Sequence, residues 1–201
     1  VSQAADILFA GANTIPVGED QLPVIEQTNE LGRKFNSIYG EFFPEVKAVI
    51  SDTPRLVGID GGAKASKSLN NAIYLSDSDE EITKKVMSMY TDPEHVHVQD
   101  PGKVEGNVVF EYLDIFDDRK EEVEELKKQY RAGGLGDVVL KKRLIEVLTQ
   151  LIGPIRTRRQ ELEKKIPEIM KDIANSTETV RKIAQTRMKE MKKLMKIDYF
   201  A

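Results

Sequence analysis

The sequence predicts a mixed α/β protein that is mainly helical. Two observations concern pattern: short apolar extended runs alternate with helical segments in the first third of the chain, and residues 76–201 repeat apolar residues at helical spacing. The third observation is composition, because 40% apolar and 32% charged residues are typical of a folded globular protein.

The first third alternates short helices with short extended runs. Residues 2–9 predict a short helix, and residues 14–17 and 44–50 have the length and apolar character of strands. A second helix is expected between the two strands, from Gly18 to Asn36, because apolar residues recur there near helical spacing.

Turn and capping residues mark the ends of these elements. Asp20 is the expected N-cap of the second helix, with Pro23 in its first turn. After the second strand, residues 53–71 are expected to form a loop because they combine glycines and a proline with a cluster of lysines and serines.

The remainder of the chain predicts helices joined by short connections. Ser78-x-x-Glu81 is a capping box that opens one helix, and residues 92–103 form a connection rich in Pro and Gly. Further helices are expected over residues 107–116, over 121–130 with an end at Gly133-Gly134, and along the apolar stripe 140–151 with a stop at Gly153-Pro154. Two last helices follow, the second capped by Asn175-x-x-Glu178.

Composition excludes several classes of function. The absence of cysteine excludes disulfides, thiolate zinc sites and cysteine nucleophiles. No apolar run approaches the ~20 residues that a membrane helix needs, and no secretion signal is evident, so we expect a cytoplasmic protein without a membrane partner. Because apolar helical sequence begins directly after Val1, we also expect the sequence to start inside a domain.

Charge is unevenly distributed along the chain. Residues 141–201 contain 16 Lys and Arg against 8 Asp and Glu, a net charge of +8. Because the whole chain has a net charge of −4, residues 1–140 carry −12. A basic segment of this kind predicts contact with a polyanion, although a solvated set of helix faces would have the same composition.

A lysine–serine cluster lies in the glycine-rich loop, as Gly62-Ala63-Lys64-Ala65-Ser66-Lys67-Ser68. Two lysines three residues apart and interleaved with serines can hold a triphosphate whose charge redistributes as pyrophosphate leaves. At a separation of about 4 Å, each ammonium would contribute ~4 kcal/mol of attraction at an effective dielectric constant of about 20. The cluster alone is also compatible with an ordinary solvated loop.

The cluster resembles the KMSKS loop of class I aminoacyl-tRNA synthetases, with Ala65 where the family usually has Met. Further segments, in the same order along the chain, resemble bacterial members of the tryptophanyl-tRNA synthetase family. They are Ala4-Ala5-Asp6-Ile7-Leu8, Val17-Gly18-Glu19-Asp20-Gln21, residues 85–93, 101–107 and 133–137, Gly153-Pro154-Ile155-Arg156, and Ile197-Asp198-Tyr199-Phe200.

This resemblance implies a fold, an activity and partners. Residues 1–75 would be the C-terminal part of a Rossmann-type catalytic domain, and residues 76–201 an all-α helical domain that binds the tRNA anticodon. The intact enzyme would be a tryptophan–tRNA ligase that uses ATP with Mg²⁺, binds L-tryptophan and tRNA, and forms a homodimer.

The resemblance also implies roles for individual residues. Asp6 would accept a hydrogen bond from the indole N–H of tryptophan, and Gln3 and Gln21 would lie in the same pocket. Lys64 and Lys67 would be the catalytic residues. The residues that would contact ATP are Gly18, Glu19, Asp20, Leu56, Lys64, Ala65, Ser66, Lys67 and Ser68. The residues that would contact tRNA are Arg156, Arg158, Arg159, Lys164 and Lys165.

Two features limit these expectations. Class I synthetases need a His-x-Gly-His segment opposite the lysine loop, and the only histidines of this chain, His95 and His97, are not in such a segment. We therefore expect the chain alone to be inactive. His95-x-His97 would place both rings on one face of a strand, but no third ligand is evident, so no metal site is expected.

Two alternative functions remain open at this stage. A related class I enzyme such as a tyrosine–tRNA ligase would share the lysine loop, although Val17-Gly18-Glu19-Asp20-Gln21 and residues 101–107 favour the tryptophan enzyme. A helical RNA-binding module without catalytic activity would also explain the basic C-terminal segment.

Overall fold

The computed structural model describes residues 2–51, 56–62 and 64–199, and these residues form two compact units. The first unit combines Val1–Pro54 with Lys165–Ala201, and the second unit is Arg55–Lys164. Val1, Pro54, Ala63 and Phe200, which belong to segments discussed above, lie outside the described residues. This division into compact units does not test the domain boundary expected between residues 75 and 76, which stays a prediction.

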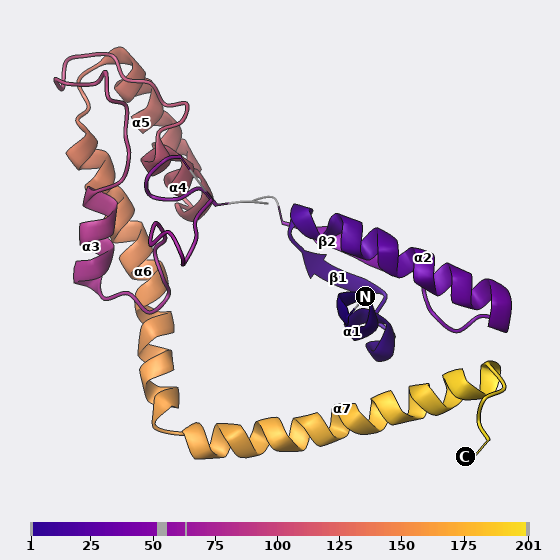
Figure 1. The fold of residues 1–201 in the computed structure, drawn as a ribbon. Helices are drawn as coiled ribbons and strands as arrows, with labels where there is room; N and C mark the ends of the chain where they lie inside the picture. Colours follow the sequence, from indigo (N-terminus) through magenta and orange to yellow (C-terminus); the bar gives the residue numbers. More distant parts are fainter. Residues whose placement is uncertain (1, 52–55, 63, 200–201) are drawn as a thin grey trace. The chain divides into compact units, whose positions relative to one another are not determined.

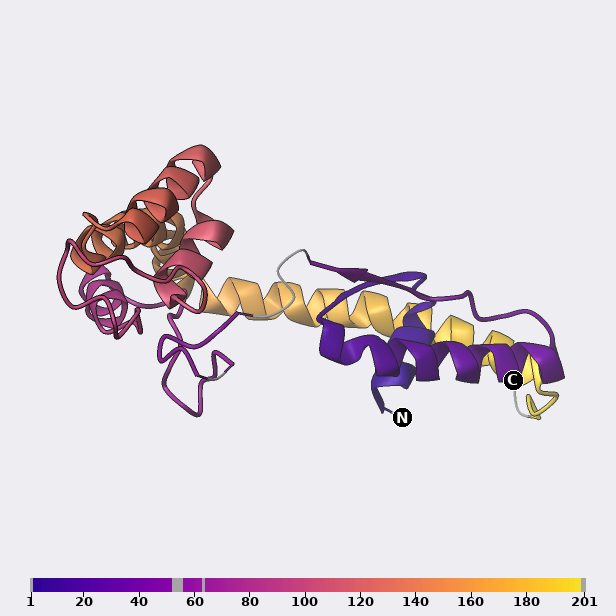
Figure 2. The ribbon, with the colours of Figure 1, turned by 90° about the horizontal axis from the view of Figure 1, so that it is seen from above.

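The first unit contains both strands of the described chain. Its elements are α1 (Ser2–Ala10), β1 (Thr14–Val17), the 3-10 helix η1 (Glu19–Gln21), α2 (Leu22–Tyr39), β2 (Lys47–Ile50) and α7 (Ile166–Leu194). β1 and β2 run parallel, with Thr14 opposite Lys47 and Val17 opposite Ile50, so their carboxyl ends lie at the same edge. α1 packs against both α2 and α7, as Figure 1 and Figure 2 show.

Two asparagines of α2 fix the segment that leads into β2. The Asn29 side chain donates to the Val46 carbonyl at 2.9 Å and accepts from the Val46 N–H at 2.8 Å. The Asn36 side chain accepts from the N–H groups of Phe42 and Phe43, each at 3.0 Å. Because an amide can donate and accept at once, these side chains replace the backbone partners that an irregular segment lacks.

The second unit is helical and holds the larger apolar core. Its helices are α3 (Asp79–Met87), α4 (Val108–Phe116), α5 (Lys120–Ala132) and α6 (Asp137–Glu163). α6 packs against α3 and α4, and α4 packs against α5 (Figure 1). The core includes Phe110, Leu113, Leu140 and Leu144, each at most 1% exposed, which places the α4–α6 contact at its centre.

The expected mixed and mainly helical class is confirmed, and so are several helix ends. Ser78 accepts from the Glu81 N–H while the Glu81 carboxylate accepts from the Ser78 N–H, which is the predicted capping box. α5 ends at Gly133, whose φ of +82° is a left-handed conformation that favours glycine.

Three predicted boundaries are wrong. Asp20 is not an N-cap: it lies inside η1, and α2 begins at Leu22 and continues past Asn36 to Tyr39. α6 does not stop at Gly153-Pro154, because Leu148 and Ile152 are buried in the core and hold the helix through the proline. α7 is one helix and is not capped again at Asn175, since apolar residues recur at helical spacing on both sides of that residue.

Among the described helices, none combines the length and the apolar composition that crossing a bilayer requires.

Candidate active site

The lysine loop of the second unit has an ordered base. Val57 and Lys64 form an isolated antiparallel bridge, and the Ala65 N–H donates to the Leu56 carbonyl at 3.1 Å. The chain then turns back, so that the Ile59 N–H donates to the Asn71 carbonyl at 2.9 Å. Three passes of the chain therefore meet beneath the loop.

The Asn71 side chain joins these passes, and the sequence-based analysis did not identify it. It is 4% exposed. Its amide oxygen accepts from the Ser66 N–H at 2.8 Å, and its amide nitrogen donates to the Asp60 carboxylate at 3.0 and 3.2 Å and to the Lys64 carbonyl at 3.4 Å. The only signal in the sequence is Asn70-Asn71 after the lysines, a pair typical of turns.

Two glycines of the loop are required by close contacts. A Cβ atom at Gly58 would lie 2.2 Å from Nδ2 of Asn71. Gly61 has a φ of +74°, and a Cβ atom there would lie 2.8 Å from the Tyr90 ring. A Cβ atom at Gly62, by contrast, would have no neighbour within 4 Å, so no close contact requires glycine at that position.

The charged groups of the loop are available to a ligand. Lys64 and Lys67 are exposed, and neither ammonium forms an ion pair with any residue of the described ranges. The hydroxyls of Ser66 and Ser68, on either side of Lys67, lie 2.8 Å apart. Leu56, which is expected to contact adenine, is half-buried and packs against the apolar core. Core packing therefore accounts for its position without a ligand.

The second expected ATP segment lies in the first unit. Gly18, Glu19 and Asp20 follow β1 directly, at the carboxyl edge of the parallel strand pair, which is where ligands bind in open α/β sheets. Glu19 and Asp20 are exposed. The Asp20 carboxylate accepts from the Gln21 amide at 3.2 Å, and a Cβ atom at Gly18 would lie 2.8 Å from that carboxylate.

The residues expected to bind tryptophan lie on two elements of the first unit. Gln3 and Asp6 are exposed and, being three residues apart on α1, share one face of the helix. Gln21 is half-buried in η1. An exposed carboxylate discriminates poorly, so the expected selectivity of Asp6 requires that a ligand or another part of the protein cover it.

The residues expected to bind tRNA differ in how they are engaged. Arg158 and Arg159 are exposed and pair along α6 with Glu161 at 3.1 Å and Glu163 at 3.0 Å. Arg156 instead reaches α3, where its guanidinium contacts the Asp77 carbonyl and the Asp79 carboxylate, the latter at 2.6 Å. Lys164 and Lys165 are exposed, the first in the second unit and the second in the first unit.

His95 and His97 do not share a strand face, because residues 91–100 form turns and irregular backbone and contain no strand. His95 is buried, with Nδ1 3.6 Å from the Asp137 carboxylate and its ring against Tyr130. Burial and the hydrogen bond to Asp137 raise the pKa of Tyr130. Within the described residues, no three acidic, histidine or cysteine side chains gather as a metal site would need.

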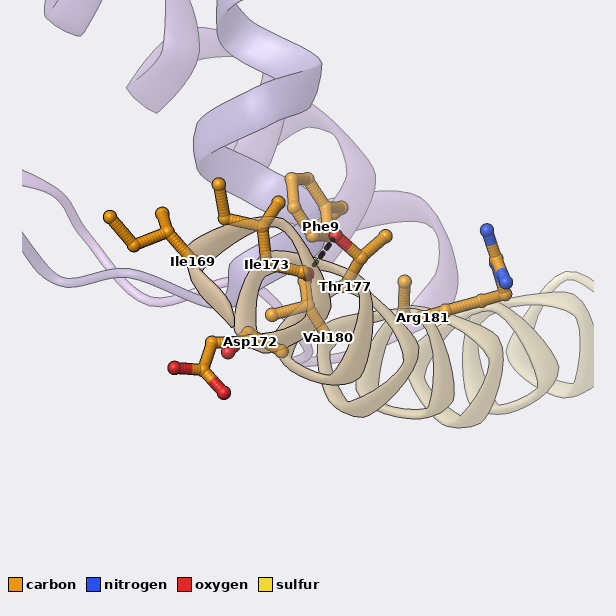
Figure 3. A pocket seen from close by; sticks show the side chains of 9 residues that line it. Phe9, Ile169, Asp172, Ile173, Thr177, Val180 and Arg181 are labelled. Carbon is orange, nitrogen blue, oxygen red and sulfur yellow. Dashed lines mark hydrogen bonds between the residues drawn. The ribbon is translucent and has the colours of Figure 1, made fainter. Parts of the chain in front are cut away.

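An apolar hollow of about 680 Å³ lies in the first unit, between α7 and Phe9 of α1 (Figure 3). Ile169, Ile173 and Val180 line it, and Thr177 donates to the Ile173 carbonyl at 2.7 Å within the helix. No residue that the sequence assigned to a substrate lies there, so the hollow and the expected active site are separate.

Comparison with known proteins identifies a family. The sequence profile described as "tRNA synthetases class I (W and Y)" matches residues 1–153. The chain is 53% identical over 203 residues to a tryptophan–tRNA ligase of Clostridium longisporum, and 47% identical over 206 residues to that of Streptococcus pneumoniae. Both alignments include the whole chain but only 60% of the relative.

Solved structures agree with this result. The fold resembles a tryptophanyl-tRNA synthetase of Campylobacter jejuni, solved with ADP and tryptophan, with a TM-score of 0.76 at 30% identity over 96% of this chain and 60% of the other. The corresponding protein of Mycoplasma pneumoniae gives a TM-score of 0.69 at 20% identity, over the same shares of the two chains, which is a likeness of fold.

Proposed function

The chain belongs to the W and Y family of class I tRNA synthetases, and on this premise we propose that it is the C-terminal part of a tryptophan–tRNA ligase. The full-length enzyme would activate L-tryptophan with ATP and pass it to tRNA. The observation that carries the proposal is the lysine loop, in which the buried Asn71 side chain and the Val57–Lys64 bridge support the backbone. Its two ammonium groups are exposed and have no ion-pair partner among the described residues.

We propose tryptophan rather than tyrosine as the substrate because of the enzymes to which the chain is most similar in sequence among the relatives described above. The family description includes both amino acids, whereas the curated relatives at 53% and 47% identity are tryptophan–tRNA ligases. In the proposal, Asp6 accepts the indole N–H, and Gln3 and Gln21 contribute to the same pocket. A ligand without that N–H would leave the carboxylate unpaired, which is a large penalty once the site is closed.

The reaction would proceed in two steps. An oxygen of the tryptophan carboxylate attacks the α-phosphorus of ATP, the bond to the leaving pyrophosphate breaks, and tryptophanyl adenylate forms. A terminal hydroxyl of tRNA then attacks the activated carbonyl and releases AMP. Lys64 and Lys67 would neutralise the pyrophosphate as its charge grows, with Ser66 and Ser68 donating to its oxygens.

The remaining ATP contacts would come from exposed groups of the first unit and from the base of the loop. Gly18 would allow close backbone approach to the ribose, and Glu19 and Asp20 would accept from its hydroxyls. Leu56 and Ala65 would contact the nucleotide. Mg²⁺ would be bound to the phosphates of ATP and would neutralise part of their negative charge.

The tRNA would be bound by the helical part of the protein, residues 76–201, through the basic segment that carries +8. Arg158, Arg159, Lys164 and Lys165 are exposed and suit phosphate contacts, whereas Arg156 would act mainly by supporting α3. We propose further that the full-length enzyme is a homodimer and acts in the cytoplasm.

Amino-acid-dependent exchange of pyrophosphate into ATP tests the function. The full-length protein should catalyse exchange with tryptophan, and Lys67→Ala should suppress it. Exchange with tyrosine in place of tryptophan would assign the protein to the other substrate of the family. tRNA binding without exchange for either amino acid would favour an RNA-binding module instead.

A further inference from the structure

Resting on the proposed function, we infer that Asn71 is a positioning residue for the lysine loop. It touches neither of the proposed catalytic ammonium groups. Instead, its side chain holds the backbone on both sides of Ala65, at the Lys64 carbonyl and the Ser66 N–H. The inference extends the site beyond the residues that meet ATP.

The contacts of Asn71 require a side chain that both donates and accepts hydrogen bonds. The amide oxygen accepts from the Ser66 N–H at 2.8 Å, while the amide nitrogen donates to the Asp60 carboxylate at 3.0 and 3.2 Å. One side chain must therefore donate and accept at the same place. Because Asn71 is only 4% exposed, water has little access to its amide and cannot readily replace either hydrogen-bond partner.

The packing around Asn71 supports the same conclusion. Gly58 leaves room for the amide, since a Cβ atom there would overlap Nδ2 at 2.2 Å. The Asp60 carboxylate that receives the amide also accepts from the Gly62 N–H at 3.4 Å, so it links Asn71 to the glycine turn. The amide thus connects the turn before the lysines with the backbone between them.

Lys67 is reached through the neighbouring residue. The Asn70 N–H donates to the Lys67 carbonyl at 3.3 Å, and Asn70 has a φ of +51°. This left-handed turn joins Lys67 directly to the anchored Asn71. Because no described residue holds the ammonium groups themselves, their positions depend on the backbone that Asn71 fixes.

A loosened backbone should affect the chemical step more than ATP binding. A long lysine side chain can still reach a phosphate from a displaced loop. Its ammonium group is then less often in the position that stabilises the leaving pyrophosphate in the transition state. Misplacement by about 1 Å can lower a rate by ~100-fold. We therefore expect kcat for adenylate formation to fall while the KM for ATP stays nearly constant.

The test compares three variants in the full-length protein. Asn71→Ala removes donor and acceptor, and should lower kcat by about 10- to 100-fold with the KM for ATP changed less than about threefold. Asn71→Asp keeps the acceptor but places two carboxylates together, and should be at least as damaging. Combining Asn71→Asp with Asp60→Asn exchanges donor and acceptor, so the double variant should recover part of the kcat that Asn71→Asp loses.

Asn36→Ala is the matched control, because Asn36 also fixes a backbone segment through its amide, but in the first unit. It should lower the melting temperature without the split between kcat and KM. Limited tryptic digestion of the folded full-length variants separates a loosened loop from general destabilisation, with the rate of cleavage after Lys64 and Lys67 measured by mass spectrometry against the rate at other sites. That rate should rise specifically in Asn71→Ala.

The outcomes separate this inference from the proposed function. If Lys67→Ala abolishes exchange while Asn71→Ala leaves kcat and loop cleavage unchanged, the positioning role is wrong and the function stands. If neither substitution affects exchange, the assignment of the lysine loop itself fails. A double variant no more active than Asn71→Asp would exclude the proposed pairing with Asp60.

Discussion

The Tyr112 hydroxyl donates a hydrogen bond of 2.8 Å to the carbonyl of Val57, and so joins α4 to the base of the lysine loop. Tyr112 is 1% exposed and belongs to the apolar core. Burial, followed by the negative charges of Glu111 and Asp60, raises the pKa of Tyr112 to about 12. The loop is therefore attached to the apolar core of its unit.

Tyr112→Phe should lower the free energy of unfolding by about 1 kcal/mol, because the Val57 carbonyl loses its donor while the ring packing stays. Since the folded pKa lies above the ordinary value of about 10, the hydroxyl stabilises the protein fully below pH ~10. That contribution is lost as the pH rises through 12. Urea unfolding of both proteins between pH 8 and 12 measures the difference, and a constant difference over that range would contradict the argument.

Asp117→Ala should destabilise the second unit by about 1.5–3 kcal/mol, because it removes the buried carboxylate that accepts from Arg143 at 2.7 Å and leaves the exposed Glu122, at 2.6 Å, as the remaining partner of that guanidinium. Burial acts to raise the pKa of Asp117, but hydrogen bonds from Arg143 and Arg119 outweigh it and the pKa is lowered. The stabilisation is therefore present above pH ~4 and lost as the pH falls through the lowered pKa. Urea unfolding at pH 7 and below pH 4 tests this, with the exposed Asp118→Ala as control.

Lys67→Ala should lower kcat for adenylate formation in the full-length protein by ~30- to 1000-fold, equivalent to about 2–4 kcal/mol. The reason is that the ammonium meets the growing charge of pyrophosphate mainly in the transition state. Pre-steady-state measurements at varied ATP separate kcat from KM, with the exposed Lys34→Ala on α2 as control. A raised KM with unchanged kcat would mean that Lys67 only binds ATP.

Charge reversal at Arg158 and Arg159 should weaken tRNA binding by the full-length protein and flatten its dependence on salt, because fewer counterions are released from phosphates. Stability should change little, since exposed ion pairs of this kind contribute at most about 1 kcal/mol. Filter binding at several salt concentrations measures both quantities. Arg131→Glu, on α5 and outside the basic segment, is the control; equal affinity of all three proteins would remove these arginines from the interface.

The 201-residue chain alone should not support tryptophan-dependent pyrophosphate exchange. Its histidines are His95 and His97, so it has no His-x-Gly-His segment to oppose the lysine loop across the triphosphate. Exchange measured with the purified chain should equal the background without enzyme. Activity within about tenfold of a full-length relative would show that one side of the phosphate site is sufficient.

Helix positions were predictable where local chemistry decides them, and less so where packing does. The Ser78–Glu81 capping box lies within four residues and was correctly identified. Pro154 argues for a helix end on local grounds, but burial of Ile152 in the core maintains α6 through it. Asn175 is a good cap in isolation, yet the apolar face of α7 continues past it.

The candidate site shows the same division. Lys64 and Lys67 could be proposed from the sequence because their loop resembles the KMSKS loop, and their role stays a prediction. Asn71 could not be proposed in this way, because its contacts with Asp60 and Ser66 exist only in the folded loop. The sequence therefore suggests the two lysines as candidates, but it does not suggest the asparagine that holds their backbone.

The discontinuity of the first unit has a consequence for how the protein is made. Residues 165–201 leave the ribosome after the whole second unit, although they pack with α1 from the beginning of the chain. The second unit can therefore collapse during translation, while the α1–α7 contact must wait for the C-terminal helix. Until then, the apolar residues of α1 have no partner on α7, and this interval is when a nascent chain would most need a chaperone.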